Sequence, residues 1–190
     1  MTKQNKIFIT FVIVFFSIWL SILVYTNTVV LGNYIIPDKI EKEFEFTKIS
    51  QIERKIIFET MANPENFPKI LSNNVLSVKI INQTGNEIIA EEEISEAGIS
   101  TKILVKHVII PYEKHIIEIL EGDAQGTTIT ISFESENSTT IIKSKIKMKV
   151  KGILLPFGFL PENNLKSAWN SVISGFEDYV EKNMNYDNVT

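Results

Sequence analysis

The chain of 190 residues contains no cysteine, so disulfides, thiol nucleophiles and cysteine-ligated metals are excluded. It has only two histidines, His107 and His115, and their spacing does not match the tight ligand sets of zinc sites. The sequence also lacks the G-x-S-x-G, H-E-x-x-H and glycine-rich phosphate-binding motifs. We therefore predict no catalytic set, no metal site and no cofactor.

Basic residues do not outnumber acidic ones. The formal net charge is −4, and the part of the chain that follows Lys3 and Lys6 is more acidic still. Proteins that bind nucleic acid by its phosphates need a basic surface. Nucleic acid is therefore not expected as a partner.

Charge is absent altogether between Lys6 and Asp38, and the stretch Ile7–Tyr25 is almost wholly apolar. A helix needs roughly 20 apolar residues to cross a hydrocarbon core about 30 Å thick. The run is longer than the apolar part of a secretory signal and no Ala-x-Ala-like cleavage site follows it, so an uncleaved anchor is favoured over a cleaved signal. We predict a transmembrane anchor over residues 1–31 and a linker over residues 32–42.

The charges that flank this anchor predict its orientation. Lys3 and Lys6 precede the apolar run, whereas acidic and basic residues alternate after Asp38. By the positive-inside rule the N-terminus lies in the cytoplasm. The rest of the chain is then extracytoplasmic, in a single-pass membrane protein whose partner is the lipid bilayer.

The remaining sequence predicts an α+β domain over residues 43–184 and a tail over residues 185–190. Strand-like alternation comes first, then two short helices, then a long region in which apolar residues recur at every second position, and finally an amphipathic helix. Short turns between the six later strands indicate an antiparallel meander with one buried face. The expected elements are a strand at 44–52, helices at 54–61 and 64–71, strands between 75 and 150, and a helix at 162–182.

The segment from Phe58 to Leu71 (FETMANPENFPKIL) resembles the opening motif of the START/polyketide cyclase-like (SRPBCC) superfamily. In that motif an apolar helix precedes a small-Asp/Asn-x-Glu-x-aromatic-Pro-x-aliphatic-Leu stretch. The closing helix, with Trp169 and Phe176 on its apolar face, is also similar to that family. The resemblance covers about residues 43–182 and implies the helix-grip fold, in which a curved antiparallel sheet wraps around the long C-terminal helix.

The resemblance implies an apolar cavity between sheet and helix. Members of the superfamily bind lipids, sterols, isoprenoid quinones or aromatic polyketides, and only some are enzymes. We therefore expect membrane-tethered binding of a small apolar ligand of the lipid, isoprenoid or quinone class. A cyclase-type enzyme, with His107 or an inward Glu as base, and a protein-interaction module with a filled core are the alternatives. The residues expected to line the cavity or its cover are Phe58, Phe67, Ile103, Val105, His107, Phe157, Phe159, Trp169, Val172, Ile173 and Phe176.

Several of these features also have ordinary structural interpretations. The apolar face of the C-terminal helix suits a filled core as well as a cavity, and His107, in phase with inward residues, suits a core or rim histidine. We expect His115 to be exposed, because it begins a strand after a turn.

The alternating lysines from Lys143 to Lys151 suit a solvated sheet face, with Glu91 and Glu93 as pairing partners, as well as a membrane-facing one. The apolar loop 152–161 is expected either to cover the cavity mouth or to pack beneath the helix.

Overall fold

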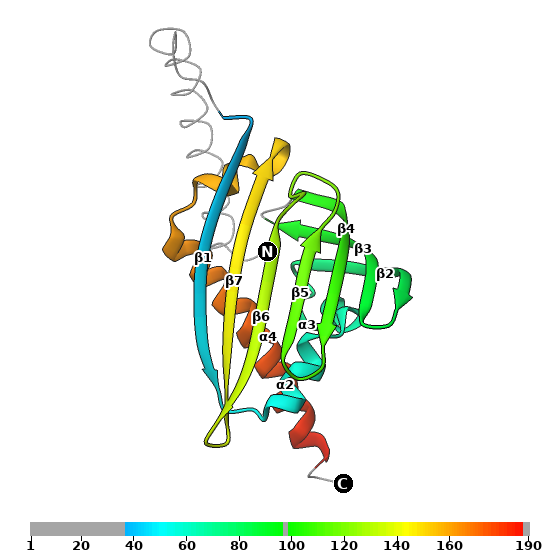
Figure 1. The fold of residues 1–190 in the computed structure, drawn as a ribbon, viewed down its shortest axis with the longest axis vertical. Coiled ribbons are helices and arrows are strands. Elements are labelled where there is room, and N and C mark those ends of the chain that lie inside the picture. The colour runs from blue at the N-terminus through cyan, green and yellow to red at the C-terminus, as the bar shows by residue number, and fades with distance from the viewer. Residues whose placement is uncertain (1–36, 97–98, 188–190) are drawn as a thin grey trace, which may run out of the picture. The chain divides into compact units, whose positions relative to one another are not determined.

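A computed structural model describes residues 37–96 and 99–187, and these form one antiparallel sheet with helices on one face (Figure 1). The strand order is β1-β7-β6-β5-β4-β3-β2, a meander that the first strand joins at the β7 edge. The predicted helix-grip arrangement is therefore confirmed. The elements are β1 (Lys39–Ser50), α2 (Arg54–Met61), η1 (Pro64–Asn66), α3 (Phe67–Ile70), β2 (Val75–Thr84), β3 (Glu87–Glu96), β4 (Ile99–Ile110), β5 (Lys114–Ile119), β6 (Thr128–Glu136), β7 (Thr139–Lys151), η2 (Gly152–Phe159) and α4 (Glu162–Asp187).

The first strand begins earlier than the sequence predicts. Its pairing with β7 starts at Lys39 opposite Lys151, so residues 39–42, assigned above to the linker, belong to the sheet. Alternation explains the difference, because Ile40 and Phe44 share the inward face and Ile40 packs against η2. At the other end α4 continues to Asp187, beyond the predicted start of the tail at residue 185.

The predicted anchor, residues 1–31, lies outside the described residues. Within the ranges 37–96 and 99–187, no helix has the length and apolar character needed to cross a membrane. Residues 38–190 form one unit that contains the complete sheet and both apolar clusters of the core. We therefore expect this segment to fold without the residues that precede it.

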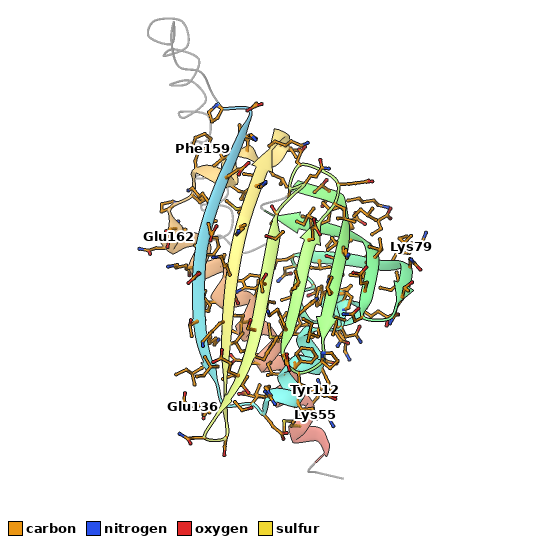
Figure 2. All side chains as sticks on the ribbon, in the orientation of Figure 1. Lys55, Lys79, Tyr112, Glu136, Phe159 and Glu162 are labelled. Atoms are coloured by element: carbon orange, nitrogen blue, oxygen red, sulfur yellow. The ribbon has the colours of Figure 1, made fainter. Side chains whose placement is uncertain are left out.

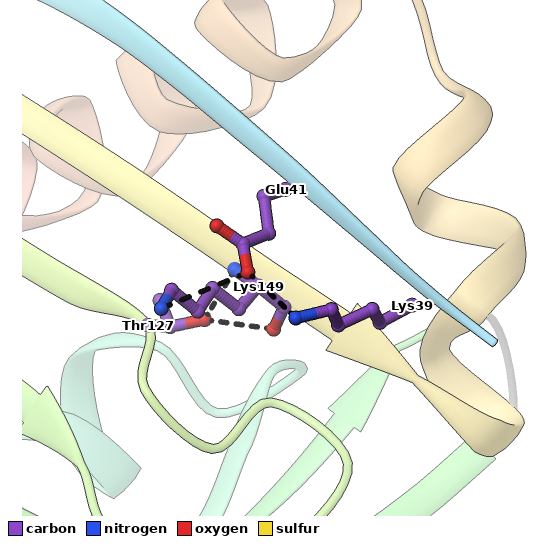
Figure 3. A network of polar contacts seen from close by, with 4 residues as sticks. All are labelled: Lys39, Glu41, Thr127 and Lys149. Atoms are coloured by element: carbon purple, nitrogen blue, oxygen red, sulfur yellow. Dashed lines mark hydrogen bonds and ion pairs between the residues drawn. The ribbon is translucent and has the colours of Figure 1, made fainter. Parts of the chain in front are cut away.

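The outer face of the sheet carries a two-strand charge ladder. Lys145 Nζ lies 2.7 Å from Glu43 Oε1, and Lys149 Nζ lies 3.8 Å from Glu41 Oε1, which also contacts Lys39 (Figure 3). The lysines of β7 therefore face glutamates of β1. The predicted partners Glu91 and Glu93 are not involved, since the sheet order places β3 far from β7. Exposed pairs of this kind contribute little stability and keep the face hydrated.

The inner face is covered by α2, which contacts β6, and by α4, which contacts β1 (Figure 1). Phe58 of α2 packs edge-on against Phe133 of β6, and Phe67 packs edge-on against Phe176 of α4. The inward Lys48 fixes α4 to the sheet edge, with Nζ 2.7 Å from Glu177 Oε2. These contacts set the height of α4 above the sheet.

The apolar segment η2 is a 3₁₀ turn packed on the sheet edge. Leu154 is buried beside Ala124 and Val150, and Phe157 packs against the same cluster. Phe159 points outward and is 61% exposed (Figure 2). Of the two alternatives for residues 152–161, the packed one describes Leu154 and Phe157.

A substitution at Gly158 tests whether the start of β1 is a packed part of the domain. A Cβ at this position would lie 2.7 Å from Ile40 Cβ, too close for two carbons. We expect Gly158→Ala to lower the free energy of unfolding by about 1–3 kcal/mol, measured by urea denaturation. In Gly158→Ala/Ile40→Gly the overlap disappears, because glycine removes the Cβ of residue 40, so the combined loss should be smaller than the sum of the single losses. Additive losses would contradict this packing.

Candidate functional site

A cavity of about 410 Å³ lies between the inner face of the sheet and the helices. Its wall is almost entirely apolar, because β3, β4, β5 and β6 turn alternate residues inward and α4 turns one face toward them. Branched and aromatic side chains dominate the strands here, as β-propensity favours. The lining residues are Met61, Phe67, Leu71, Asn74, Val75, Glu92, Ile94, Ser95, Ile103, Val105, Ile117, Ile119, Ile129, Ile131, Met148, Trp169, Val172 and Phe176.

A second hollow of about 340 Å³ adjoins the cavity toward β1 and β7. The two share Trp169 and Val172 of α4, together with Leu71, Asn74 and Ile129. The indole Nε1 of Trp169 is buried and, within the described residues, has no hydrogen-bond partner. A buried N–H normally has a hydrogen-bond acceptor. The Trp169 N–H beside the two hollows can therefore donate a hydrogen bond to a carbonyl or ether oxygen of a ligand.

The residues that the sequence suggested for the cavity fall into three groups. Phe67, Ile103, Val105, Trp169, Val172 and Phe176 line it. Phe58, Ile173 and His107 are buried in the core behind it and do not belong to its wall. Phe157 and Phe159 also do not line it, because η2 packs at the sheet edge beside Ile40 and Ala124.

Three polar side chains form a buried chain across three strands, which begins at Glu92 in the cavity wall and continues behind it. Glu92 Oε1 of β3 lies 3.0 Å from His107 Nε2 of β4, and His107 Nδ1 lies 3.0 Å from His115 Nε2 of β5. Both histidines are fully buried and their rings stack, with centroids 5.2 Å apart. The sequence prediction that His115 is exposed was wrong.

The geometry allows two arrangements of the protons in this chain when Glu92 is ionised. If His107 is neutral, its Nδ1 accepts from His115 and its Nε2–H donates to Glu92 Oε1. If His107 is protonated, its Nδ1–H donates to His115 and its Nε2–H again donates to Glu92. In both arrangements an ionised Glu92 accepts one hydrogen bond from His107.

Burial holds His115 in its neutral form. It lowers the pKa of His115 from 6.5 to about 3, and the nearby His107 lowers it too, while the Met61 backbone opposes the shift. His115 Nδ1 makes no hydrogen bond of normal geometry within the described residues, although Met61 lies close enough to favour the protonated ring. The described residues contain no group of three or more acidic, histidine or cysteine side chains that could hold a metal ion.

Sequence reasoning missed Glu92 as a named site residue and misplaced His115. Both positions carried a signal, because Glu92 is in phase with the inward Ile88 and Ala90, and His115 is in phase with Ile117. Glu91, Glu92 and Glu93 are consecutive, so the polar pattern alone does not show which of the three side chains points inward. The turn before His115 favoured exposure, whereas the phase of the strand buries it.

Comparisons with known proteins show the fold. No protein-family model matches the sequence, and no curated protein sequence is significantly similar to it. Solved structures with the same fold include TTHA0849 from Thermus thermophilus, with a TM-score of 0.64 and 14% identity over 74% of this chain and 98% of that one. Ara h 8.0201 has a TM-score of 0.59 and 18% identity over 75% of this chain and 99% of its own. The Zhui aromatase/cyclase from a Streptomyces species has a TM-score of 0.57 and 11% identity over 76% of this chain and 96% of its own.

The buried histidine predicts a specific dependence of stability on acid. Below pH 6.5 the unfolded chain binds a proton on His115 that the folded protein does not bind until about pH 3, so stability falls as the pH falls through this range. We expect the free energy of unfolding to fall less steeply in His115→Gln, by up to about 1.4 kcal/mol per pH unit. Urea unfolding at a series of pH values measures both slopes. Parallel curves for the two proteins would show that His115 titrates normally in the folded state.

Proposed function

We propose that this protein binds a small apolar molecule of the lipid, isoprenoid or quinone class in the cavity between sheet and α4. The observation that carries the proposal is the cavity itself, whose volume of about 410 Å³ lies in the usual range for ligand sites. Its apolar wall favours burial of hydrocarbon at roughly 25 cal/mol per Å². A filled core, the alternative suited to a protein-interaction module, would leave no such volume.

The adjoining hollow supports an elongated ligand. Trp169 and Val172 border both spaces, so a molecule that enters the cavity can extend past them toward Phe44 and Leu165. The indole N–H of Trp169, which has no hydrogen-bond partner among the described residues, lies at this junction and can donate to one acceptor on the molecule. An apolar body with few polar groups is what such a site recognises.

A second candidate is a cyclase-type reaction inside the cavity. The buried Glu92–His107 pair, 3.0 Å apart, is the observation that favours it, because a desolvated carboxylate beside an imidazole can take a proton from a substrate. The fold is shared with a protein described as an aromatase/cyclase. Binding and catalysis differ in whether the molecule leaves the cavity chemically changed, which mass spectrometry of the released molecule measures.

The binding proposal predicts a bound molecule that depends on free volume. We expect the purified protein to carry an apolar compound, seen by native mass spectrometry and after organic extraction. Val172→Phe places a larger side chain at the junction of the two hollows. The volume left for a ligand is then smaller, and forcing a ligand into a filled space costs free energy, so the occupancy should fall several-fold.

The matched control for this substitution is Val108→Phe. Val108 follows the inward His107 on β4, so its side chain lies on the opposite face, and it does not line either hollow. It receives the same added ring, so its occupancy should equal that of the unsubstituted protein. A protein that carries no compound and takes up none from added lipid would overturn the proposal.

We also propose that residues 1–31 tether the domain to a membrane, with the N-terminus in the cytoplasm. The support is the charge-free run Ile7–Tyr25.

We expect the full chain to remain with membranes after alkaline extraction and residues 38–190 to be released. Protease added outside the intact cell membrane should degrade the domain. Full release of the intact chain by alkali would contradict the tether, and protection from protease would contradict the orientation.

A further inference from the structure

Glu92 is the one charged side chain among the described residues that line the cavity. It is 6% exposed and lies on β3 between inward apolar neighbours, Ala90 and Ile94. An ionised group in such surroundings loses its hydration and must find partners within the protein or on a ligand. The partners of Glu92 therefore bear on what the cavity accepts.

The position of this carboxylate is fixed from behind. His107 Nε2 lies 3.0 Å from Oε1, and His115 holds His107 in turn at 3.0 Å. The ring of Phe67 lies edge-on to His107, with centroids 6.0 Å apart. Because His107 and His115 are fully buried, neither can move aside without opening the core.

His107 uses only part of the hydrogen-bonding capacity of Glu92. A carboxylate has two oxygens and about four acceptor sites. Within residues 37–96 and 99–187, His107 is the one side chain that hydrogen-bonds it. The remaining capacity is on a residue of the cavity wall, so a molecule that enters can use it.

This leftover capacity discriminates between apolar molecules of similar size. A pure hydrocarbon would displace water from the carboxylate and offer nothing in return, which costs free energy. A ligand carboxylate would be repelled by Glu92. A hydroxyl group donates a short, charge-assisted hydrogen bond while adding no charge to the cavity.

We infer that Glu92, held by His107 and His115, selects apolar ligands that carry a hydroxyl group, as an alcohol, phenol or enol, and accepts a hydrogen bond from it. This inference rests on the proposed ligand-binding function and specifies its ligand class. Glu92 is then the residue that orients the ligand. His107 and His115 act through it as positioning residues.

A matched pair of probes tests the inference. 2-Naphthol and 2-methoxynaphthalene have the same ring system, but only the naphthol has an O–H to donate. We expect titration calorimetry to show that the protein binds 2-naphthol at least about tenfold more tightly than 2-methoxynaphthalene. A hydrogen bond to a charged group contributes enough binding free energy for a tenfold difference in affinity. The more apolar methoxy compound would be favoured if burial of apolar area alone decided the affinity.

Variants assign the preference to Glu92. Glu92→Gln keeps the size of the side chain and removes its charge, so the preference for 2-naphthol should fall to about threefold or less. Glu93→Gln is the matched control, because Glu93 lies next along β3, pairs with Ser77 and is absent from the cavity wall. Its preference should equal that of the unsubstituted protein. Unfolding curves establish that each variant is folded, and both the full chain and residues 38–190 are measured.

A second measurement needs no substitution. 2-Naphthol becomes a much stronger acid in its excited state, so a bound naphthol whose O–H contacts the Glu92 carboxylate transfers its proton to it and emits as naphtholate. We expect naphtholate emission from the bound probe in the unsubstituted protein and its loss in Glu92→Gln. Emission from neutral naphthol alone would overturn the inference even if Glu92→Gln does not fold.

The outcomes separate this inference from the function on which it rests. If both probes bind with equal affinity and Val172→Phe weakens both, apolar-ligand binding stands and hydroxyl selection by Glu92 is overturned. If neither probe binds, the inference is overturned, and the proposed function fails with it only if the protein also carries no compound and takes up none from added lipid. If the preference persists in Glu92→Gln, another group recognises the hydroxyl and the inference is overturned.

Discussion

The structure depends on a mismatch between one broad sheet and the few helices that cover it. Seven strands must bury one face, and α4 with the short α2 and α3 is all that the described residues supply for this purpose. The helices are fixed to the sheet at β6 by a packed aromatic pair and at β1 by the Lys48–Glu177 ion pair. Between these contacts the cover is incomplete: the cavity lies against β3, β4, β5 and β6, and the second hollow extends toward β1 and β7. A fully packed interior would be more stable, because empty volume forfeits contacts on the atoms around it.

The same region contains the one buried polar chain that, among the described residues, crosses three strands, from Glu92 through His107 to His115. Buried ion pairs and imidazole pairs are weak stabilisers, because desolvation offsets their attraction. Each member nevertheless depends on the next, since removal of His107 would leave the Glu92 carboxylate without the donor that compensates its burial. The chain thus fixes the side-chain positions of β3, β4 and β5 at the cavity wall, where few large apolar contacts are available to do so.

The sequence predicted the order of elements, the inward phase of β4 and the apolar face of α4, because alternation and helical periodicity are strong over long elements. It placed Ile103, Val105, Trp169, Val172 and Phe176 on the inner face, and all of them line the cavity. It could not distinguish wall residues from filled core, so Phe58 and Ile173 were included although they pack behind the wall. That distinction depends on how far α4 stands from the sheet, which is set by contacts between distant segments such as Lys48 with Glu177. The early start of β1 was missed because charged residues surround Ile40. The glutamates that pair with the β7 lysines were also missed, because they depend on the order of strands in the sheet, which local sequence patterns do not contain.

Stability alone does not account for Glu92. An apolar side chain at this position would complete the wall between Ala90 and Ile94, fill part of the cavity and remove the cost of a desolvated charge. His107 and His115 could then also be replaced by apolar residues, which need no hydrogen-bond partners when they are buried. The fold instead keeps a carboxylate in the wall of an apolar space, where His107 is the one side chain among the described residues that hydrogen-bonds it, and loses stability in acid because His115 stays neutral. Proteins retain such costs where a group serves binding or chemistry. The cavity and the carboxylate are therefore best understood together, the first as space for a hydrophobic body and the second as the acceptor that orients it.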